Sequence, residues 1–409
     1  MFCLNFTKSY KFNVFLRIFL IFAPEMKMSF AEILQQVENR RSLKLQDKLP
    51  SWAAVPGLAL PSDLSLEQCS SEATAKYKAS LLGSPATVAD LPGGMGADCW
   101  AFSQVAGTVL YFEQDPELAS AAKGNFKKLG ISNIQASCAH SDESLVESLP
   151  EQDWIFLDPA RRDGAGRKVF LLEDCTPNVL TLLPALWKKT SRLMLKLSPM
   201  ADIPLIAKRL GSELEQVHVV SSSGEVKELL CILRKGNGKP YGITVSMLEN
   251  GTALSFSPSE EQAARSIAAG TPEEGKFLHE PCAALLKAGA FRLPCAIWGL
   301  GKLAAFTHLY LSDGPLPEDA APFFKTYRII GAEQMSGTAV KSFGKAFPKA
   351  DVSARNIPMT SDQLRAKLKC APSNDGTHIF GCTAGQSRWL IAGQKVQQSI
   401  CQADTLSRT

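Results

Sequence analysis

The stretch Val88-Ala89-Asp90-Leu91-Pro92-Gly93-Gly94-Met95-Gly96-Ala97-Asp98 joins a short apolar run to a polar turn that is rich in glycine. Gly93, Gly94 and Gly96 allow the backbone to turn sharply and to approach a ligand closely. The pattern G-G-x-G lacks the last glycine of the dinucleotide-binding fingerprint G-x-G-x-x-G, because Cys99 stands in its place. This stretch therefore predicts a strand, a cofactor-binding turn and a helix, in an α/β fold that does not bind a pyrophosphate.

Apolar runs that predict strands alternate with helical segments on both sides of this turn. The expected strands cover residues 87–91, 108–113, 134–137, 154–158, 193–197, 217–221 and 229–234. Such alternation implies a mostly parallel sheet that is covered by helices on both faces. Only residues 222–228 separate the last two strands, which is too short for a parallel crossover, so the final strand should run antiparallel. A Rossmann-like sheet of seven strands with one antiparallel strand is the arrangement of class I methyltransferases.

Several residues at the ends of the first three strands are candidate cofactor contacts. Glu113 ends the second strand, where a carboxylate can accept hydrogen bonds from both ribose hydroxyls, and Gln114 follows it. Asp90 lies near the end of the first strand. His140 follows the third strand, where an adenine amino group would lie, and Asp142 is an alternative. Because the turn lacks the pyrophosphate fingerprint, we expect S-adenosylmethionine here, although a different or vacant site in an α/β fold stays open.

The sequence Asp158-Pro159-Ala160-Arg161-Arg162-Asp163 follows the fourth expected strand. Ligands of open α/β sheets bind at the carboxyl ends of strands, so Asp158 is a candidate for both cofactor and catalytic contacts. Its carboxylate can accept a hydrogen bond from an acceptor N–H or take the proton, and Pro159 makes the loop rigid. Arg161 and Arg162 are candidates to hold a substrate phosphate, but they can equally pair with nearby acids.

The fifth expected strand leads into Lys196-Leu197-Ser198-Pro199-Met200. This loop would close the other side of an acceptor pocket, with Lys196 as a substrate contact and Ser198 as a catalytic residue. The alternative is that the segment only ends the strand at Pro199.

The sequence divides into five regions. Residues 28–85 are expected to be helical, with one helix over 65–78, and a Gly-containing polar linker at 235–240 predicts a domain boundary. The expected regions are an extension at 1–27 that is disordered or follows a misassigned start, a helical segment at 28–85, a methyltransferase domain at 86–236, and α+β domains at 241–322 and 323–398.

Charge and composition limit the class of protein. The chain has a net charge of +4, but residues 323–409 contain twelve Lys and Arg against five Asp and Glu. A basic C-terminal region suggests a polyanionic partner, RNA first, or simply a solvated basic surface. The eleven cysteines form no C-x-x-C pair and the five histidines show no ligand spacing, so we expect no metal and a cytoplasmic location. The apolar stretch at 12–23 is too short to span a membrane.

These motifs resemble those of a Bacteroidetes family of class I S-adenosylmethionine-dependent methyltransferases with a ferredoxin-like module and a C-terminal THUMP-like domain. The resemblance rests on residues 66–72, 90–98, 113–117, 158–163, 196–200, 278–289, 355–358 and 364–365, and it covers roughly residues 30–398. It implies S-adenosylmethionine as the cofactor and RNA, either tRNA or rRNA, as the substrate, because THUMP domains bind RNA. It also implies Arg355 and Arg365 as RNA contacts.

A more distant similarity connects the Asp-Pro-Ala-Arg run to the 5-methyluridine RNA methyltransferases. Those enzymes carry a nucleophilic cysteine after the fifth strand, where this chain reads Leu197-Ser198-Pro199 and has no thiol. Amino-methylating enzymes place an aromatic residue after Asp-Pro-Pro, where this chain has Ala160 and Arg161. We therefore expect direct methyl transfer to a ring nitrogen or another RNA atom, with Asp158 orienting the acceptor. A protein or small-molecule acceptor, and a non-catalytic RNA-binding protein on a degenerate methyltransferase fold, stay open as alternatives.

Overall fold

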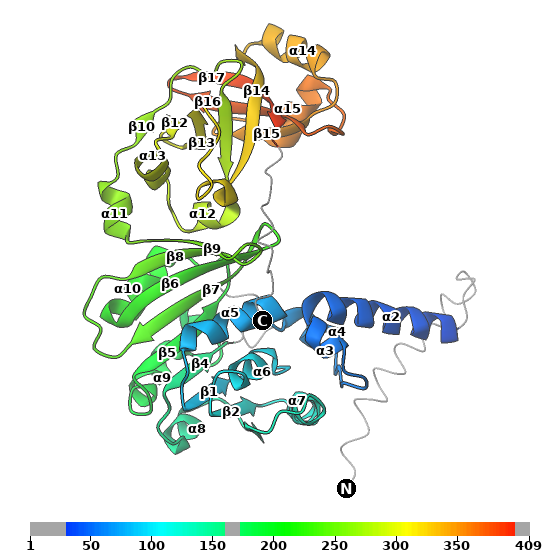
Figure 1. Ribbon diagram of the computed structural model, residues 1–409, viewed down its shortest axis with the longest axis vertical. Helices are drawn as coiled ribbons and strands as arrows, with labels where there is room; N and C mark the ends of the chain where they lie inside the picture. Colours follow the sequence, from blue (N-terminus) through cyan, green and yellow to red (C-terminus); the bar gives the residue numbers. More distant parts are fainter. Residues whose placement is uncertain (1–29, 160–171, 397–409) are drawn as a thin grey trace, which may run out of the picture. The chain divides into compact units, whose positions relative to one another are not determined.

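The computed structural model describes residues 30–159 and 172–396 of the 409-residue chain. The chain divides into two compact units, Met1–Ser141 and Asp142–Thr409, which we call the N-terminal and C-terminal units (Figure 1). Among the described residues, no helix is both long enough and apolar enough to cross a bilayer.

The N-terminal unit begins with helices α2 (Phe30–Lys48), α3 (Pro50–Ala53), α4 (Asp63–Gln68) and α5 (Glu72–Leu82). The single helix that we expected over 65–78 is wrong, because the chain is extended at Cys69 and a new helix begins after Ser71. The Ser71 hydroxyl accepts a hydrogen bond from the Thr74 backbone N–H at 3.3 Å and so caps α5. The break therefore arises from a capping serine inside a sequence with good helix propensity.

The rest of the N-terminal unit alternates strands and helices as predicted. Its elements are β1 (Thr87–Leu91), α6 (Ala97–Ser103), β2 (Thr108–Glu113), α7 (Pro116–Lys128) and β3 (Ile134–Cys138). The strands are parallel and lie in the order β3-β2-β1. Asp115 caps α7 with hydrogen bonds to the N–H groups of Glu117 and Leu118, and Pro116 occupies the first helical position. Helices α5 and α6 lie side by side (Figure 1).

The first sheet of the C-terminal unit confirms the antiparallel strand that the short connection predicted. Its elements before residue 235 are α8 (Glu143–Ser148), β4 (Trp154–Leu157), η1 (Leu172–Asp174), α9 (Val179–Leu186), β5 (Arg192–Leu197), α10 (Ile203–Leu210), η2 (Gly211–Glu213), β6 (Leu214–Ser222) and β7 (Glu225–Arg234). Within this unit the strand order is β4-β5-β7-β6, and β7 is antiparallel to both neighbours. The orders β3-β2-β1 and β4-β5-β7-β6 are those of the two halves of a class I methyltransferase sheet.

The domain boundary that we expected at 235–240 does not end this sheet. Strand β8 (Gly242–Met247) pairs in parallel with β6, and β9 (Thr252–Phe256) pairs with β8. The polar linker is therefore a connection between two strands of the same sheet. Its glycines predict a turn correctly, but a turn alone does not indicate whether the next strand joins the old sheet or begins a new one.

The chain then forms a second, eight-stranded sheet. Its elements are α11 (Pro258–Ala263), β10 (Ile267–Ala268), β11 (Phe277–Pro281), α12 (Ala283–Lys287), α13 (Leu293–Trp298), β12 (Gly301–Ala304), β13 (Thr307–Ser312), η3 (Ala321–Phe323), β14 (Phe324–Gln334), α14 (Gly337–Ala346), β15 (Asp351–Arg355), α15 (Ser361–Leu368), β16 (Thr377–Ala384) and β17 (Ser387–Lys395). The strand order is β10-β12-β13-β11-β14-β17-β16-β15. Because β11 pairs with β14, the two regions that we expected at 241–322 and 323–398 share this sheet.

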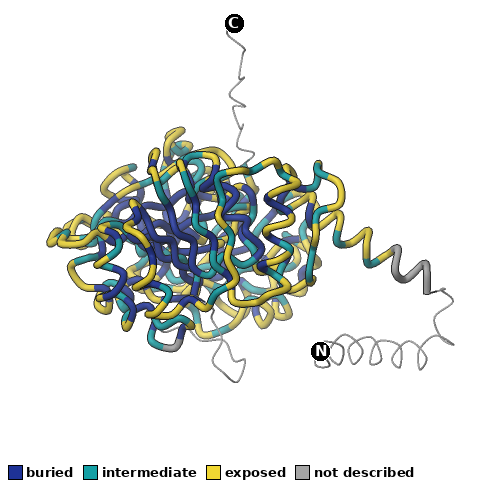
Figure 2. The backbone as a smooth tube through the Cα atoms, turned by 90° about the horizontal axis from the view of Figure 1, so that it is seen from below, coloured by how far each residue is buried: buried dark blue, intermediate teal, exposed yellow. Residues whose placement is uncertain are grey.

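The central strands of both sheets of the C-terminal unit are buried. Figure 2 shows the buried residues in the interior and the exposed residues at the periphery. In the second sheet, one apolar cluster lies under α14 and α15 and includes Phe343 and Leu364. A second cluster on the opposite face joins β12 and β13 to β14, β16 and β17, and it includes Leu309 and Phe380. The sheet is therefore covered on one face by helices and on the other by its own strands.

Candidate active site

The glycine turn after β1 has a geometry that requires two of its glycines. A Cβ atom on Gly93 would lie 2.3 Å from the Tyr111 ring, and one on Gly96 would lie 2.4 Å from the Phe126 ring. Gly96 also has φ +87° and Gly94 has φ +54°, values that favour glycine. At Gly94 an added Cβ would meet nothing within 4 Å, so the backbone there is open to a ligand.

Glu113 holds this turn through its carboxylate. Its Oε2 accepts a hydrogen bond from the Gly94 N–H at 2.9 Å, and its Oε1 accepts one from the Asp115 N–H at 2.9 Å. The Glu113 side chain is nearly buried, at 6% exposure. A carboxylate oxygen has a second lone pair, so both oxygens can still accept from a ligand hydroxyl. Glu113 therefore fits the predicted role beside a ribose.

Tyr111 supports the turn from β2. Its hydroxyl donates a hydrogen bond to the Gly94 carbonyl, and its ring packs edge-on against Phe126 at 5.5 Å. Burial, followed by the nearby carboxylate of Glu113, raises the pKa of Tyr111 well above its ordinary value. The hydroxyl therefore stays protonated and remains a donor.

The other predicted cofactor residues differ in exposure. Asp90 is completely buried near the end of β1, while Gln114 after β2 and His140 after β3 are both exposed. Burial, with Asp90 and then Asp98 as the next causes, raises the pKa of the Cys99 thiol well above its ordinary value. Asp90 thus lies among buried groups behind the turn, whereas Gln114 and His140 lie where a ligand can reach them.

Sequence reasoning missed a buried ionic group that connects α5 to the segment after the glycine turn. Lys78 is completely buried, and its Nζ lies 3.1 Å from Asp98 Oδ1 in the first turn of α6. The same Nζ donates to the Ser70 hydroxyl at 3.0 Å, and Ser70 in turn donates to Asp98 Oδ2 at 2.7 Å. The available signal was that Lys78 lies in the apolar stripe of α5, between Ala75 and Leu82.

In the C-terminal unit, Asp158 and Lys196, which were both predicted to lie at the acceptor pocket, form an ion pair. Asp158 and Lys196 follow the paired residues Leu157 and Leu195 on adjacent strands. Lys196 Nζ donates a hydrogen bond to Asp158 Oδ2 at 2.6 Å. The Lys196 side chain is 13% exposed and the Asp158 side chain is 35% exposed. The ammonium orients the carboxylate and balances its charge. Among the residues that the structure describes, the hydrogen bond of the Asp158 carboxylate is the one from Lys196, and it is made at Oδ2.

The loop after β5 is shaped by Ser198 and held from outside by α12. The Ser198 hydroxyl accepts a hydrogen bond from the Met200 N–H at 3.2 Å and is almost buried, at 6% exposure. Met200 is 70% exposed. Lys287 Nζ donates to the Ala201 carbonyl at 2.7 Å. Ser198 therefore fixes the conformation of this loop, and its predicted catalytic role stays a prediction. Pro159 is buried at the end of the neighbouring strand.

The predicted phosphate and RNA contacts are dispersed. Arg161 and Arg162 lie outside the described residues. Arg355 Nη2 forms an ion pair with Glu280 Oε1 at 2.6 Å, which joins the end of β15 to β11. Arg365 Nη1 lies 3.6 Å from Asp362 Oδ1 within α15. The RNA-binding role predicted for Arg355 and Arg365 therefore competes with contacts inside the protein.

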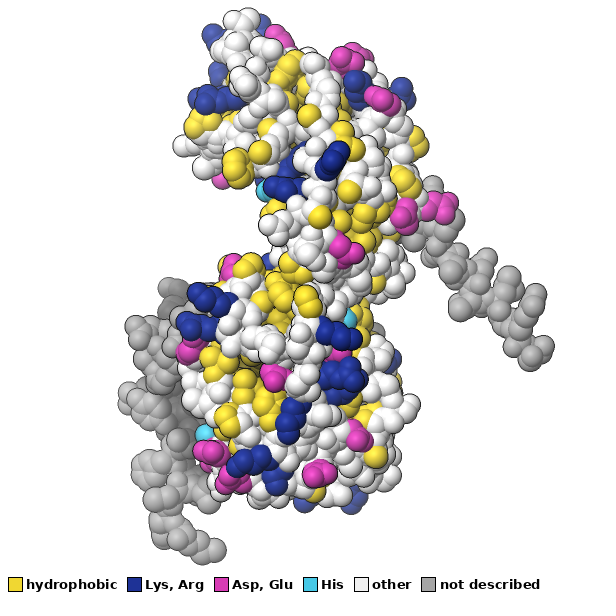
Figure 3. Space-filling model, turned by 90° about the vertical axis from the view of Figure 1, so that its left-hand side faces the viewer, with side chains coloured by type: hydrophobic (Ala, Val, Ile, Leu, Met, Phe, Trp, Pro, Cys, Tyr) yellow, Lys and Arg dark blue, Asp and Glu magenta, His cyan; other side chains and the backbone are white. Residues whose placement is uncertain are grey.

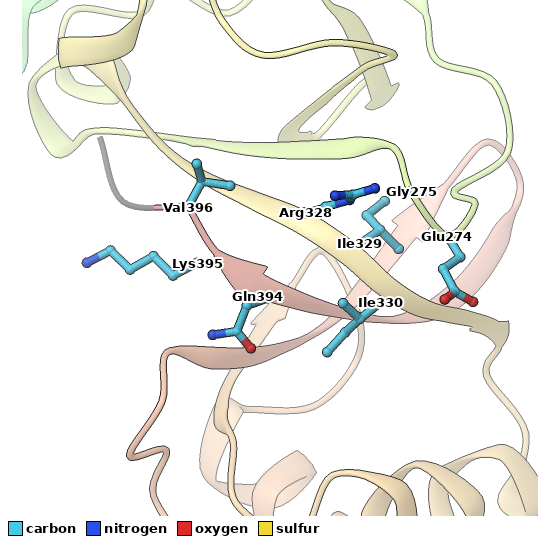
Figure 4. A pocket seen from close by; sticks show the side chains of 8 residues that line it. All are labelled: Glu274, Gly275, Arg328, Ile329, Ile330, Gln394, Lys395 and Val396. Carbon is cyan, nitrogen blue, oxygen red and sulfur yellow. The ribbon is translucent and has the colours of Figure 1, made fainter. Parts of the chain in front are cut away.

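A hollow of about 490 Å³ opens beside β14 and β17 and includes two cations of the basic C-terminal region. Arg328, Lys395, Gln394 and Glu274 lie along it, and all four are at least partly exposed. Figure 4 shows the Lys395 side chain extending away from Arg328, so the two charges do not converge on one ligand. Within residues 30–159 and 172–396, no three His, Cys, Asp or Glu side chains are grouped to hold a metal ion.

Comparison with known proteins identifies the family. Residues 277–318 match a family described as a ferredoxin-like domain, and we call these residues the ferredoxin-like module. The crystal structure of a Porphyromonas gingivalis W83 protein assigned as a methyltransferase is 30% identical, with a TM-score of 0.76, over 87% of this chain and 88% of that chain. The chain belongs to this Bacteroidetes methyltransferase family. The predicted family and the class I methyltransferase fold are thereby confirmed.

Other solved structures show much weaker likeness. An rRNA methylase from Streptococcus thermophilus is 13% identical, with a TM-score of 0.30, over 40% of this methyltransferase and 93% of that chain. A tRNA m1G37 methyltransferase from M. jannaschii is 11% identical, with a TM-score of 0.28, over 40% of this chain and 48% of that chain. Likeness at this level does not bear on the acceptor. No curated protein matches the sequence.

Proposed function

We propose that this methyltransferase uses S-adenosylmethionine to methylate RNA, either tRNA or rRNA, by direct transfer. The observation that carries the cofactor assignment is the Glu113 carboxylate, which holds the open Gly94 backbone and keeps lone pairs for a ligand. A ribose needs such an acceptor, and the turn lacks the pyrophosphate fingerprint that a dinucleotide would require. His140 and Gln114 are proposed as further cofactor contacts.

The bound cofactor would supply a methyl group on a sulfonium, and the electrons of the broken C–S bond return to sulfur as the acceptor forms the new bond. The protein's part is to orient the acceptor and to receive or share its proton. Asp158 Oδ1 is suited to accept a hydrogen bond from an acceptor N–H, because Lys196 already holds Oδ2. The carboxylate is thereby fixed in one orientation, and positioning supplies much of the rate.

The RNA assignment is supported by charge and by the family resemblance. Residues 323–409 carry twelve Lys and Arg against five Asp and Glu, as a polyanion-binding region would. We propose that the THUMP-like residues 323–398 contribute to RNA binding, together with Arg161 and Arg162 near the acceptor. A protein or small-molecule acceptor would not need this excess of positive charge.

A transfer assay with two readouts tests this proposal. The full chain would be incubated with tritiated S-adenosylmethionine and unfractionated bacterial tRNA or rRNA, and label would be counted in RNA and in protein. We expect label in RNA, and its loss in Asp158→Asn but not in the control Asp313→Asn, whose carboxylate is 94% exposed. If the protein binds S-adenosylhomocysteine but no RNA becomes labelled, the assignment of RNA as the acceptor is wrong. If the protein does not bind S-adenosylhomocysteine, the assignment of the cofactor is wrong.

A further inference from the structure

The turn between β12 and β13 exposes an aromatic ring on the ferredoxin-like module. Ala304 and Thr307 are paired across the two strands, so Ala305 and Phe306 form the tip of a hairpin. Phe306 is 78% exposed and, among the residues that the structure describes, it is the one exposed aromatic residue. A single exposed apolar side chain is common on protein surfaces, so a binding role depends on how the ring is held and on what lies beside it.

The hairpin that carries Phe306 is held on both of its strands. The Leu303 carbonyl on β12 accepts a hydrogen bond from the Gly385 N–H at 2.8 Å. On β13, the hydroxyl of the completely buried Thr307 accepts one from Asn356 Nδ2 at 3.2 Å. The Phe306 ring is therefore presented from a fixed backbone, and the protein loses little conformational freedom when a ligand stacks on it.

An accessible ion pair lies beside this tip. Arg355 directly precedes Asn356, which is bonded to the residue that follows Phe306. Arg355 Nη2 donates a hydrogen bond to Glu280 Oε1 at 2.6 Å, and the Arg355 side chain stays 44% exposed. Within residues 30–159 and 172–396, this is the hydrogen bond that the guanidinium makes, so its other N–H groups can donate to a ligand.

A second cation adjoins the ion pair. Lys325 at the start of β14 is exposed and is paired in register with Glu280 on β11. Because β11 lies between β14 and the hairpin strand β13, Lys325 is roughly 10 Å from β13. Two cations against one carboxylate give this side of the hairpin a net positive charge. Figure 3 shows Lys and Arg side chains next to exposed hydrophobic ones on one face of the region that the second sheet forms.

An aromatic ring with cations beside it matches the chemistry of an unpaired nucleotide. Bases of single-stranded RNA stack on aromatic side chains, while Lys and Arg hold the phosphates that follow. A protein partner fits less well, because the core of a protein–protein interface is depleted of Lys and Glu, and Lys325 and Glu280 both lie here. The surface around Phe306 therefore favours RNA over a second copy of the chain.

We propose that Phe306 is a stacking platform for an unpaired base of the RNA, with Arg355 and Lys325 holding the adjoining backbone phosphates. This assignment rests on the proposed RNA acceptor and adds that the ferredoxin-like module binds the RNA at a single-stranded nucleotide. The ion pair with Glu280 orients the Arg355 guanidinium and leaves its remaining N–H groups for a phosphate. A paired base is stacked within its own helix, so double-stranded RNA would not use the platform.

The first test is RNA affinity as a function of salt. The full chain would be titrated with a fluorescein-labelled single-stranded RNA, and with the same RNA in a duplex, over a range of KCl concentrations. We expect Phe306→Ala to weaken single-strand binding by about 5- to 150-fold, the range for one base stacked on an aromatic ring. The slope of log Kd against log salt should not change in Phe306→Ala, because the ring is uncharged, whereas Lys325→Met should reduce it by roughly 0.7. Duplex binding should be insensitive to Phe306→Ala.

A matched control and a direct readout accompany the titration. Ile297→Ala removes another exposed apolar side chain of the module, 46% exposed on α13, and should leave both affinities unchanged. In Phe306→Trp the new indole should retain RNA binding, and single-stranded RNA should quench its fluorescence beyond the quenching seen with the unmodified protein. Ile297→Trp should show no such additional quenching.

The outcomes separate this platform from the proposed function. If the unmodified protein binds RNA and Phe306→Ala behaves like Ile297→Ala, the platform is wrong while the RNA acceptor stands. If the unmodified protein binds no RNA, both proposals fall. Sedimentation covers the other occupant, since self-association that is lost in Phe306→Ala would assign the ring to a second copy of the chain and overturn the platform. Unchanged far-UV circular dichroism and S-adenosylhomocysteine binding would show that Phe306→Ala folds.

Discussion

Glu113→Gln is the substitution that most directly tests the cofactor site. Glu113 accepts two backbone hydrogen bonds, from Gly94 and from Asp115, at 2.9 Å each. Glutamine has the same shape but only one acceptor oxygen. Its amide nitrogen would therefore face one of the two N–H groups, placing a donor against a donor in a site with 6% exposure.

The expected losses of stability and of ligand affinity in Glu113→Gln follow from these contacts. A hydrogen bond to a charged group contributes about 1.5 to 3 kcal/mol, and leaving one buried donor unsatisfied costs about 1 to 3 kcal/mol. We therefore expect the free energy of unfolding to fall by about 2 to 4 kcal/mol. The loss of one ribose acceptor and the shifted turn should weaken S-adenosylhomocysteine binding by roughly 10- to 100-fold, since 1.4 kcal/mol corresponds to a factor of ten.

Calorimetric titration of S-adenosylhomocysteine, with urea unfolding of the same samples, measures both effects. Glu117→Gln is the matched control, because Glu117 is an exposed glutamate in the first turn of α7. It should bind the ligand like the unmodified protein. If Glu113→Gln binds as tightly as this control, Glu113 does not contact the cofactor and the reasoning from the turn is refuted.

Three further predictions concern burial, pH and backbone conformation. Lys78→Met should lower the free energy of unfolding by about 3 to 5 kcal/mol in urea, because a carboxylate stays buried without its ammonium, whereas the exposed Lys76→Met should change it by less than about 1 kcal/mol. His279 has a pKa of about 4 through burial, below its ordinary 6.5, so only the unfolded chain is protonated between these values. The free energy of unfolding should therefore fall by up to about 3 kcal/mol as pH drops from 6.5 to 4, and His279→Gln should flatten the dependence of the urea midpoint on pH. Gly96→Ala should lower both Tm and ligand affinity, because the new Cβ would lie 2.4 Å from the Phe126 ring. The control Gly130→Ala, where φ is +72° and the added Cβ meets nothing within 4 Å, should lose only about 1 to 2 kcal/mol through backbone strain and should bind the ligand with unchanged affinity.

Local patterns account for the parts of the fold that were predicted. Asp115 and Pro116 indicated the start of α7, and the short connection at 222–228 indicated an antiparallel β7, because both depend on neighbours in sequence. The boundaries near 235–240 and 322 were not predictable in this way. Whether β8 joins β6, and whether β14 joins β11, depends on which sheet edge is free, and edges are formed by residues far away in the chain.

The same difference between local patterns and long-range pairing applies to the candidate active site. The glycine turn, Glu113 at the end of β2 and Asp158 directly after β4 could be predicted from residue type and from position at a strand end. The partners of the charged side chains, by contrast, depend on the packing of elements that are distant in sequence. This packing paired Lys196 with Asp158 at 2.6 Å, buried Lys78 against Asp98, and directed Arg355 to Glu280. Long charged side chains have several partners within reach, and the packing of distant strands and helices selects among them.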